Sequence, residues 1–330
     1  MKHPIHWTKA DLHKHLQHAI DLELWTIPLY LTALYSIKDL KKLRPSDYPD
    51  EAKLIFSVVV QEMLHLELVC NISNALGYAP KIKQPVYDGS KGVPFIHPEK
   101  TLIPDILKGY KVKPQALNEA SLKLFCVIEL PHPMTEPDWD KLKSFDAIAT
   151  LYLALETGIK KFWNECYVGD KQNTKQKENF NEYHNKDDKS HGFSQIVDSL
   201  ESALLAVQAI VAQGEGSDTR NVPVDYRPVI PTNSNRMDAG WYKANLSHYH
   251  KFRLLLHHKD VLPPVYSEKP PHSIPTKESQ SMLAFREFLL EMEHHFNQDG
   301  KELPPSFWNK MSAVGFRMME DWEAGRCPWW

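Results

Sequence analysis

Two side chains of metal-binding type interrupt an apolar stripe in residues 51–76. The stripe advances in steps of three and four residues, as the buried face of a helix does, through Ile55, Val58, Glu62, His65, Val69, Ile72 and Leu76. Burying an ionised carboxylate without a partner costs several kcal/mol or more. Glu62 and His65, one turn apart on an inward face, therefore need a cation between them or a strong polar partner.

Two further predicted helices carry a glutamate on the apolar stripe. Residues 8–38 begin with a capping-box pattern, and Glu23 occupies a core position of this segment. Residues 141–163 repeat the three-and-four spacing, with Glu156 in the middle of the stripe. One such glutamate alone usually has an ordinary hydrogen-bonded role, but its repetition on separate helices favours a shared site.

The remaining candidates lie on less regular stripes. Residues 194–215 place Glu215 on a mostly apolar face, and residues 241–255 place His248 on an aromatic face while His250 points elsewhere. These segments complete a predicted set of metal ligands, which is Glu23, Glu62, His65, Glu156, Glu215 and His248. The four carboxylates would balance two divalent cations, and oxygen and imidazole ligands without a thiolate suit iron or manganese better than structural zinc.

Length and composition limit the classes open to the chain. Its 330 residues, 42% of them hydrophobic, allow a large core, and we expect one domain over 1–330, with a bundle core at about 8–256 and a helical extension at about 257–330. A formal charge of −3 gives no electrostatic reason to expect nucleic acid. No apolar run reaches the ~18–20 residues of a membrane span, a signal-peptide pattern is missing, and the cysteines are scattered, so we expect a cytoplasmic protein.

The chain is predicted to be all-α. Helices are expected at 8–38, 50–76, 115–129, 139–165, 194–214, 240–257, 279–296 and 304–323. Polar or Pro-rich segments separate them at 167–192, 216–238 and 258–278. The first of these has almost no aliphatic residue and is expected to be a mobile surface loop.

Several strings of residues resemble the ferritin-like superfamily and, more narrowly, the ferritin-like family associated with iminophenyl-pyruvate dimer synthases of bisindole biosynthesis. The strings are ELWTIPLYL at 23–31, QEMLHL at 61–66, NISNALG at 71–77, QGEG at 213–216 and SHYHKF at 247–252. The resemblance covers most of residues 10–256. It implies a four-helix bundle with an interrupted fourth helix, long loop insertions and extra C-terminal helices.

The fourth helix departs from the pattern of the superfamily, in which it carries its own Glu-x-x-His. Here 32 residues separate Glu215 from His248, so we interpret this helix as interrupted by a loop and resumed at His248. If it does not resume, Glu201 is the alternative carboxylate. The dimer synthases are much longer proteins, so their reaction is not transferred to this chain.

These features predict a non-haem di-iron oxidase or oxygenase that uses O2 on a small organic substrate, in secondary metabolism. The cofactor is expected to be two Fe ions, although Mn/Fe and other divalent pairs have overlapping ligand sets. An electron donor and a homo-oligomeric state stay open, and neither a membrane nor a nucleic-acid partner is expected. The alternatives are a ferroxidase or metal-storage protein, and a bundle whose metal site is structural or degenerate.

Overall fold

The computed structural model describes residues 1–87, 103–107, 112–132, 136–180, 195–216, 222, 227–229, 231, 242, 244–269 and 279–328. Within these ranges the chain forms eight α-helices and no β-strand, which confirms the all-α prediction. The helices are α1 (Lys9–Tyr35), α2 (Asp50–Ala75), α3 (Glu119–Ile128), α4 (Ile148–Cys166), α5 (Leu200–Gly214), α6 (His248–His257), α7 (Gln280–Phe296) and α8 (Pro305–Glu323).

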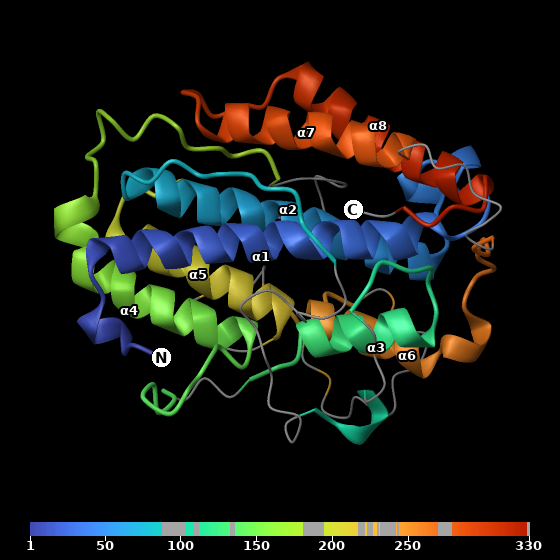
Figure 1. The fold of residues 1–330 in the computed structure, drawn as a ribbon, viewed down its shortest axis with the longest axis horizontal. Helices are drawn as coiled ribbons and strands as arrows, with labels where there is room; N and C mark the ends of the chain where they lie inside the picture. The colour runs from blue at the N-terminus through green and yellow to red at the C-terminus, as the bar shows by residue number, and fades with distance from the viewer. Residues whose placement is uncertain are drawn as a thin grey trace.

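The two longest helices, α1 and α2, pack along each other in the middle of the molecule (Figure 1). α1 begins at the expected capping box, in which Thr8 and Asp11 each accept a hydrogen bond from the other's backbone amide. Every residue of α2 from Val58 to Ala75 is buried. α2 is long and apolar enough to cross a membrane, but 89% of its apolar window is buried inside the protein, as befits a core helix.

Four shorter helices cover one side of this pair, two over each half of its length (Figure 1). In the half that holds the N-terminus of α1, α4 packs against α1 and α5 packs against α2 and α4. In the other half, α6 packs against α2 and α3 packs against α6. The third and fourth helices of the bundle are therefore each broken in the middle, between α3 and α4 and between α5 and α6. The sequence predicted the second break. It also predicted separate helices at 115–129 and 139–165, but not that together they form the third helix of the bundle, and the second of them begins only at Ile148.

The helical hairpin of α7 and α8 packs on the opposite side of the central pair (Figure 1). Trp322 Nε1 of α8 donates to the carbonyl oxygen of Thr32 in α1 at 3.0 Å. Asn74 Nδ2 of α2 donates to the carbonyl oxygen of Phe296 at 2.8 Å. These buried hydrogen bonds fix the extra C-terminal helices to the bundle.

The segment 167–192 is only partly what the sequence predicts. Lys177 is buried, and its Nζ donates to the carbonyl oxygens of Gln298 at 2.7 Å and Gly300 at 2.6 Å. The first part of this segment is therefore packed against the C-terminal hairpin, because a lysine can bury its aliphatic stem when its amine finds acceptors. Residues 181–192 lie outside the described part of the chain.

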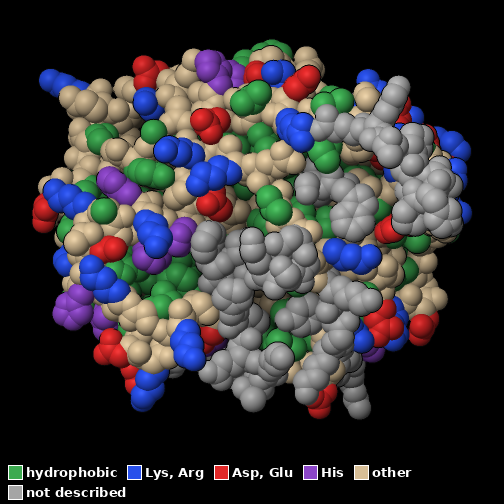
Figure 2. Space-filling view, in the orientation of Figure 1, with side chains coloured by type: hydrophobic (Ala, Val, Ile, Leu, Met, Phe, Trp, Pro, Cys, Tyr) green, Lys and Arg blue, Asp and Glu red, His purple; other side chains and the backbone are tan. Residues whose placement is uncertain are grey.

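The surface carries charges of both signs, in keeping with the small net charge of −3. On the face drawn in Figure 2, Lys and Arg side chains alternate with Asp and Glu side chains, and several histidines lie among them. The described part of this face shows no broad area of a single sign.

Candidate metal centre

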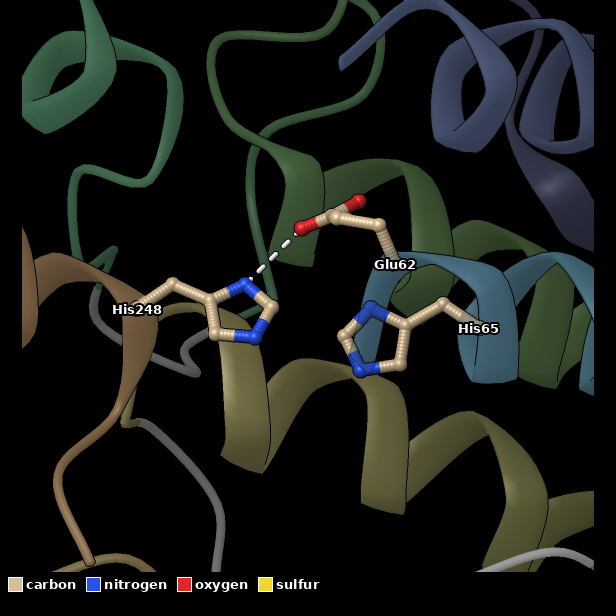
Figure 3. A group of neighbouring side chains, drawn as sticks. All are labelled: Glu62, His65 and His248. Carbon is tan, nitrogen blue, oxygen red and sulfur yellow. Dashed lines mark ion pairs between the residues drawn. The ribbon is translucent and has the colours of Figure 1, made fainter. Parts of the chain in front are cut away.

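Glu62, His65 and His248 form a compact buried group in the interior of the bundle (Figure 3). α2 presents Glu62 and His65 one turn apart, and the first residue of α6 presents His248 from the facing side. One potential ligand atom of each residue lies within 4.8 Å of the other two. The two imidazole rings are stacked, with centroids 5.2 Å apart. The interrupted fourth helix therefore does return a histidine to this group.

Two glutamine side chains set the orientation of the imidazole rings. Oε1 of Gln61 lies 3.2 Å from Nε2 of His248 and also accepts a hydrogen bond from Nζ of the buried Lys251 at 2.7 Å. Oε1 of Gln213 lies 3.0 Å from Nε2 of His65. A carbonyl oxygen can only accept, so each Nε2 carries a proton, and in the neutral ring each Nδ1 keeps its lone pair.

Both lone pairs face carboxylate oxygens. Nδ1 of His248 lies 2.8 Å from Oε1 of Glu62 and 3.6 Å from Oε1 of Glu129, and Nδ1 of His65 lies 3.4 Å from Oε2 of Glu23. Among the described residues, Nδ1 of His248 has no hydrogen-bond partner in spite of these neighbours. Two lone-pair atoms this close need a proton or a cation between them.

Each of the three carboxylates also accepts a hydrogen bond from one buried hydroxyl. The pairs are Thr26 with Glu62 at 2.7 Å, Tyr30 with Glu129 at 2.6 Å, and Tyr152 with Glu23. Burial, together with the nearby carboxylates, raises the pKa of both tyrosines well above the ordinary value, so the phenols stay protonated. The hydroxyls therefore act as fixed donors that orient the carboxylates.

Burial also controls the charge of the group itself. It raises the pKa of Glu62 well above the usual range, and repulsion from Glu129 and Glu23 raises it further. Burial lowers the pKa of His248, so this imidazole is neutral and its lone pair is available. A divalent cation would therefore displace a proton from Glu62 when it binds.

Glu129 is the carboxylate that sequence reasoning missed. It caps the C-terminus of α3, directly before the break in the third helix. Its Oε2 faces Gly214 of α5, where an added Cβ would lie only 3.1 Å away. The sequence does contain a pattern that places Glu129 inward, since Leu122, Phe125 and Glu129 follow the three-and-four spacing. In a helix this short, which ends at Glu129, the pattern is easily overlooked.

Glu156 is not brought to the centre. Its carboxylate pairs with Lys160 one turn later in α4, and its side chain is 16% exposed, against 4% for Glu23. The inward position in this part of α4 belongs to Tyr152, which donates to Glu23. The prediction that Glu156 faces the interior is wrong, because this residue stands at the edge of the apolar stripe, from which a long side chain reaches solvent.

Glu215 is buried, as expected, but both of its oxygens accept backbone hydrogen bonds. Oε1 accepts from the amide of Ala149 at 2.8 Å, and Oε2 accepts from the amide of His132 at 2.9 Å. Ala149 lies in the first turn of α4, where a carboxylate satisfies a free amide and the helix dipole. Glu215 thus joins the end of α5 to the start of α4, and Glu201, which is exposed, does not replace it as a ligand.

The structure gathers a set of donor groups that suits a metal ion. This set consists of three carboxylates and two imidazoles, from Glu23, Glu62, Glu129, His65 and His248. Such ligands, without a thiolate, suit iron or manganese. If two divalent ions were bound, three carboxylates would leave one positive charge in excess, whereas the four predicted carboxylates would have balanced the pair.

Comparison with known proteins agrees with this architecture. The sequence model described as "Ferritin-like" matches residues 16–257, and the chain therefore belongs to the ferritin-like family. A ferritin-like protein from Caulobacter vibrioides is 29% identical, with a TM-score of 0.71 and 98% of each chain covered. The comparison with curated proteins gives no match.

Proposed function

We propose that this chain is a non-haem di-iron protein that uses O2 to oxidise a small organic molecule. The observation that carries the proposal is a pair of imidazole lone pairs that face three buried carboxylates in a ferritin-like bundle. Glu-x-x-His with further inward glutamates is the ligand arrangement of di-metal carboxylate proteins. Two ferrous ions, when bound, would supply electrons to O2.

The residues of the chain would hold such ions and keep water away from them. Gln61 and Gln213 fix the imidazole tautomers, and three hydroxyls fix the carboxylates. Tyr30 and Tyr152 hold a proton at the phenolic oxygen, directly beside Glu129 and Glu23. Since these side chains are at most 3% exposed, the geometry is set before any ion binds.

Part of the proposal is a relationship to the ferritin-like family associated with iminophenyl-pyruvate dimer synthases. What supports it is that four of the five matching strings supply residues of the centre. These residues are Glu23, Gln61, Glu62, His65, Gln213 and His248. The reaction of the dimer synthases is not part of the proposal.

Anaerobic loading with ferrous iron, followed by a pulse of O2, tests the proposal. We expect about two irons per chain, oxidised rapidly when O2 is added. Many irons per chain would instead support a storage protein. Failure to bind iron would support a bundle with a structural or degenerate site.

The Glu129→Gln variant tests whether this carboxylate belongs to the site, because it removes one carboxylate charge at nearly constant volume. It should bind less iron than the unmodified protein. The Glu156→Gln variant, altered at the surface of α4, should bind iron normally. An electron donor, a homo-oligomeric state and a cytoplasmic location stay predictions.

A further inference from the structure

An apolar cavity lies on a different face of α1 and α2 from the metal centre. It is enclosed between these two helices and the hairpin of α7 and α8, with Leu31 and Phe56 on one side and Phe285 and Phe288 on the other. Its volume is about 250 Å³. The metal ligands are not among the residues that line it.

The volume of the cavity corresponds to a small organic molecule. Protein interiors are close-packed, and voids larger than a water molecule are few in any domain. An apolar cavity of about 150 Å³ stays free of water and accepts benzene, which has six heavy atoms. A cavity of about 250 Å³ therefore has room for roughly ten heavy atoms, if it is packed to the same density.

The chemistry of the lining selects among molecules of this size. None of the described residues that line the cavity is charged, so among them an ionised ligand would lose its hydration without compensation. Aromatic rings and the thioethers of Met63, Met311 and Met319 make up much of the wall. Ring edges and sulfur atoms both interact favourably with an aromatic face.

The mouth of the cavity lies at the exposed edge of α8. Ser312 is exposed and lines the cavity, and Phe316 beside it is 44% exposed. Lys41 Nζ lies 4.4 Å from the centroid of the Phe316 ring, so the rim is polar while the interior is apolar. A neutral molecule can thus enter from solvent without passing a buried charge.

We propose that this cavity is a binding site for a neutral aromatic molecule of about two fused rings. The site is separate from the metal centre and does not depend on the proposed function. Helices α1, α2, α7 and α8 all contribute to it, so its occupant would join the C-terminal hairpin to the bundle.

Equilibrium dialysis of the full chain against naphthalene tests the proposal. We expect one naphthalene per chain, and binding at least tenfold weaker for 2-naphthalenesulfonate, which has the same rings and a charge. Octane, which is apolar but not aromatic, should also bind at least tenfold more weakly. No saturable binding of naphthalene, or equal binding of either competitor, would overturn the proposal.

Matched variants test whether the ligand binds in this cavity. Ser312→Trp fills the mouth, and Val59→Phe enlarges a side chain of the wall, while Ala313→Trp puts the same bulk on the neighbouring exposed position of α8, outside the lining. We expect the first two variants to weaken naphthalene binding at least tenfold and the third to leave it unchanged. The proposal fails if both cavity variants, with thermal midpoints near that of the unmodified protein, bind naphthalene as tightly as it does.

Discussion

The Gln213→Leu variant distinguishes between two interpretations of the buried group, as a metal centre or as an ordinary buried polar cluster. Gln213 touches the centre through one contact, between its Oε1 and Nε2 of His65 at 3.0 Å. Among the described residues its Nε2 has no hydrogen-bond partner, so Gln213→Leu removes that contact with little other disturbance. The variant leaves the N–H of His65 without an acceptor and frees the ring to turn.

Two magnitudes follow from this geometry. A buried donor left without a partner costs about 1–3 kcal/mol of folding free energy. Loss of the hydrogen bond that orients a metal-binding histidine typically lowers metal affinity 10–100-fold, which is about 1.4–2.7 kcal/mol of binding free energy. We therefore expect Gln213→Leu to weaken ferrous binding by this factor, measured by anaerobic titration with a competing chelator.

Two further variants control the experiment. Gln213→Glu keeps an acceptor beside Nε2 and should retain most of the affinity. Gln208→Leu makes the same change at a half-buried position of α5 and should bind iron like the unmodified protein. If Gln213→Leu lost folding stability but bound iron with unchanged affinity, Gln213 would have only a packing role, and His65 would not be oriented for a metal.

Other predictions concern the ligands themselves. Glu62→Gln should abolish tight metal binding yet raise the thermal midpoint of the metal-free protein above pH 5. The reason is that the raised pKa of Glu62 lets the folded state bind a proton more tightly than the unfolded state, so metal-free stability falls as pH rises; an unchanged midpoint would contradict this. By the same competition, ferrous affinity of the unmodified protein should fall as the pH is lowered, and a pH-independent titration would count against a carboxylate site. His248→Ala should lose metal and His250→Ala should keep it, because the His250 ring bonds to Ser247 instead; equal metal contents would contradict the placement of α6.

The central pair of helices could be predicted well from the sequence, and the broken layer only in part, because the break in the fourth helix was predicted and the break in the third was not. α1 and α2 are long, so their apolar stripes run over many turns, and Glu23, Glu62 and His65 stand inside those stripes. A regular period over many residues fixes which face is buried. The structure gathers all three at the centre, with His248.

The errors fall at helix ends and stripe edges. Glu129 ends a helix of ten residues, too short for its period to mark one side chain as inward. Glu156 occupies a position that fits the apolar period of α4, yet Lys160 one turn away gives it a partner at the surface. Glu215 was expected to bind metal because it is inward-facing, but a carboxylate can equally be buried to hold backbone amides.

The two breaks in the outer layer have a consequence for recognising distant members of this group from sequence. Glu129 closes one helix and His248 opens another, so an insertion or deletion between such helices can change the number of intervening residues without moving a candidate ligand. A search pattern with a fixed interval, such as Glu-x-x-His on the last helix, would overlook such sequences. A pattern of four short motifs, separated by segments of variable length, would describe them better.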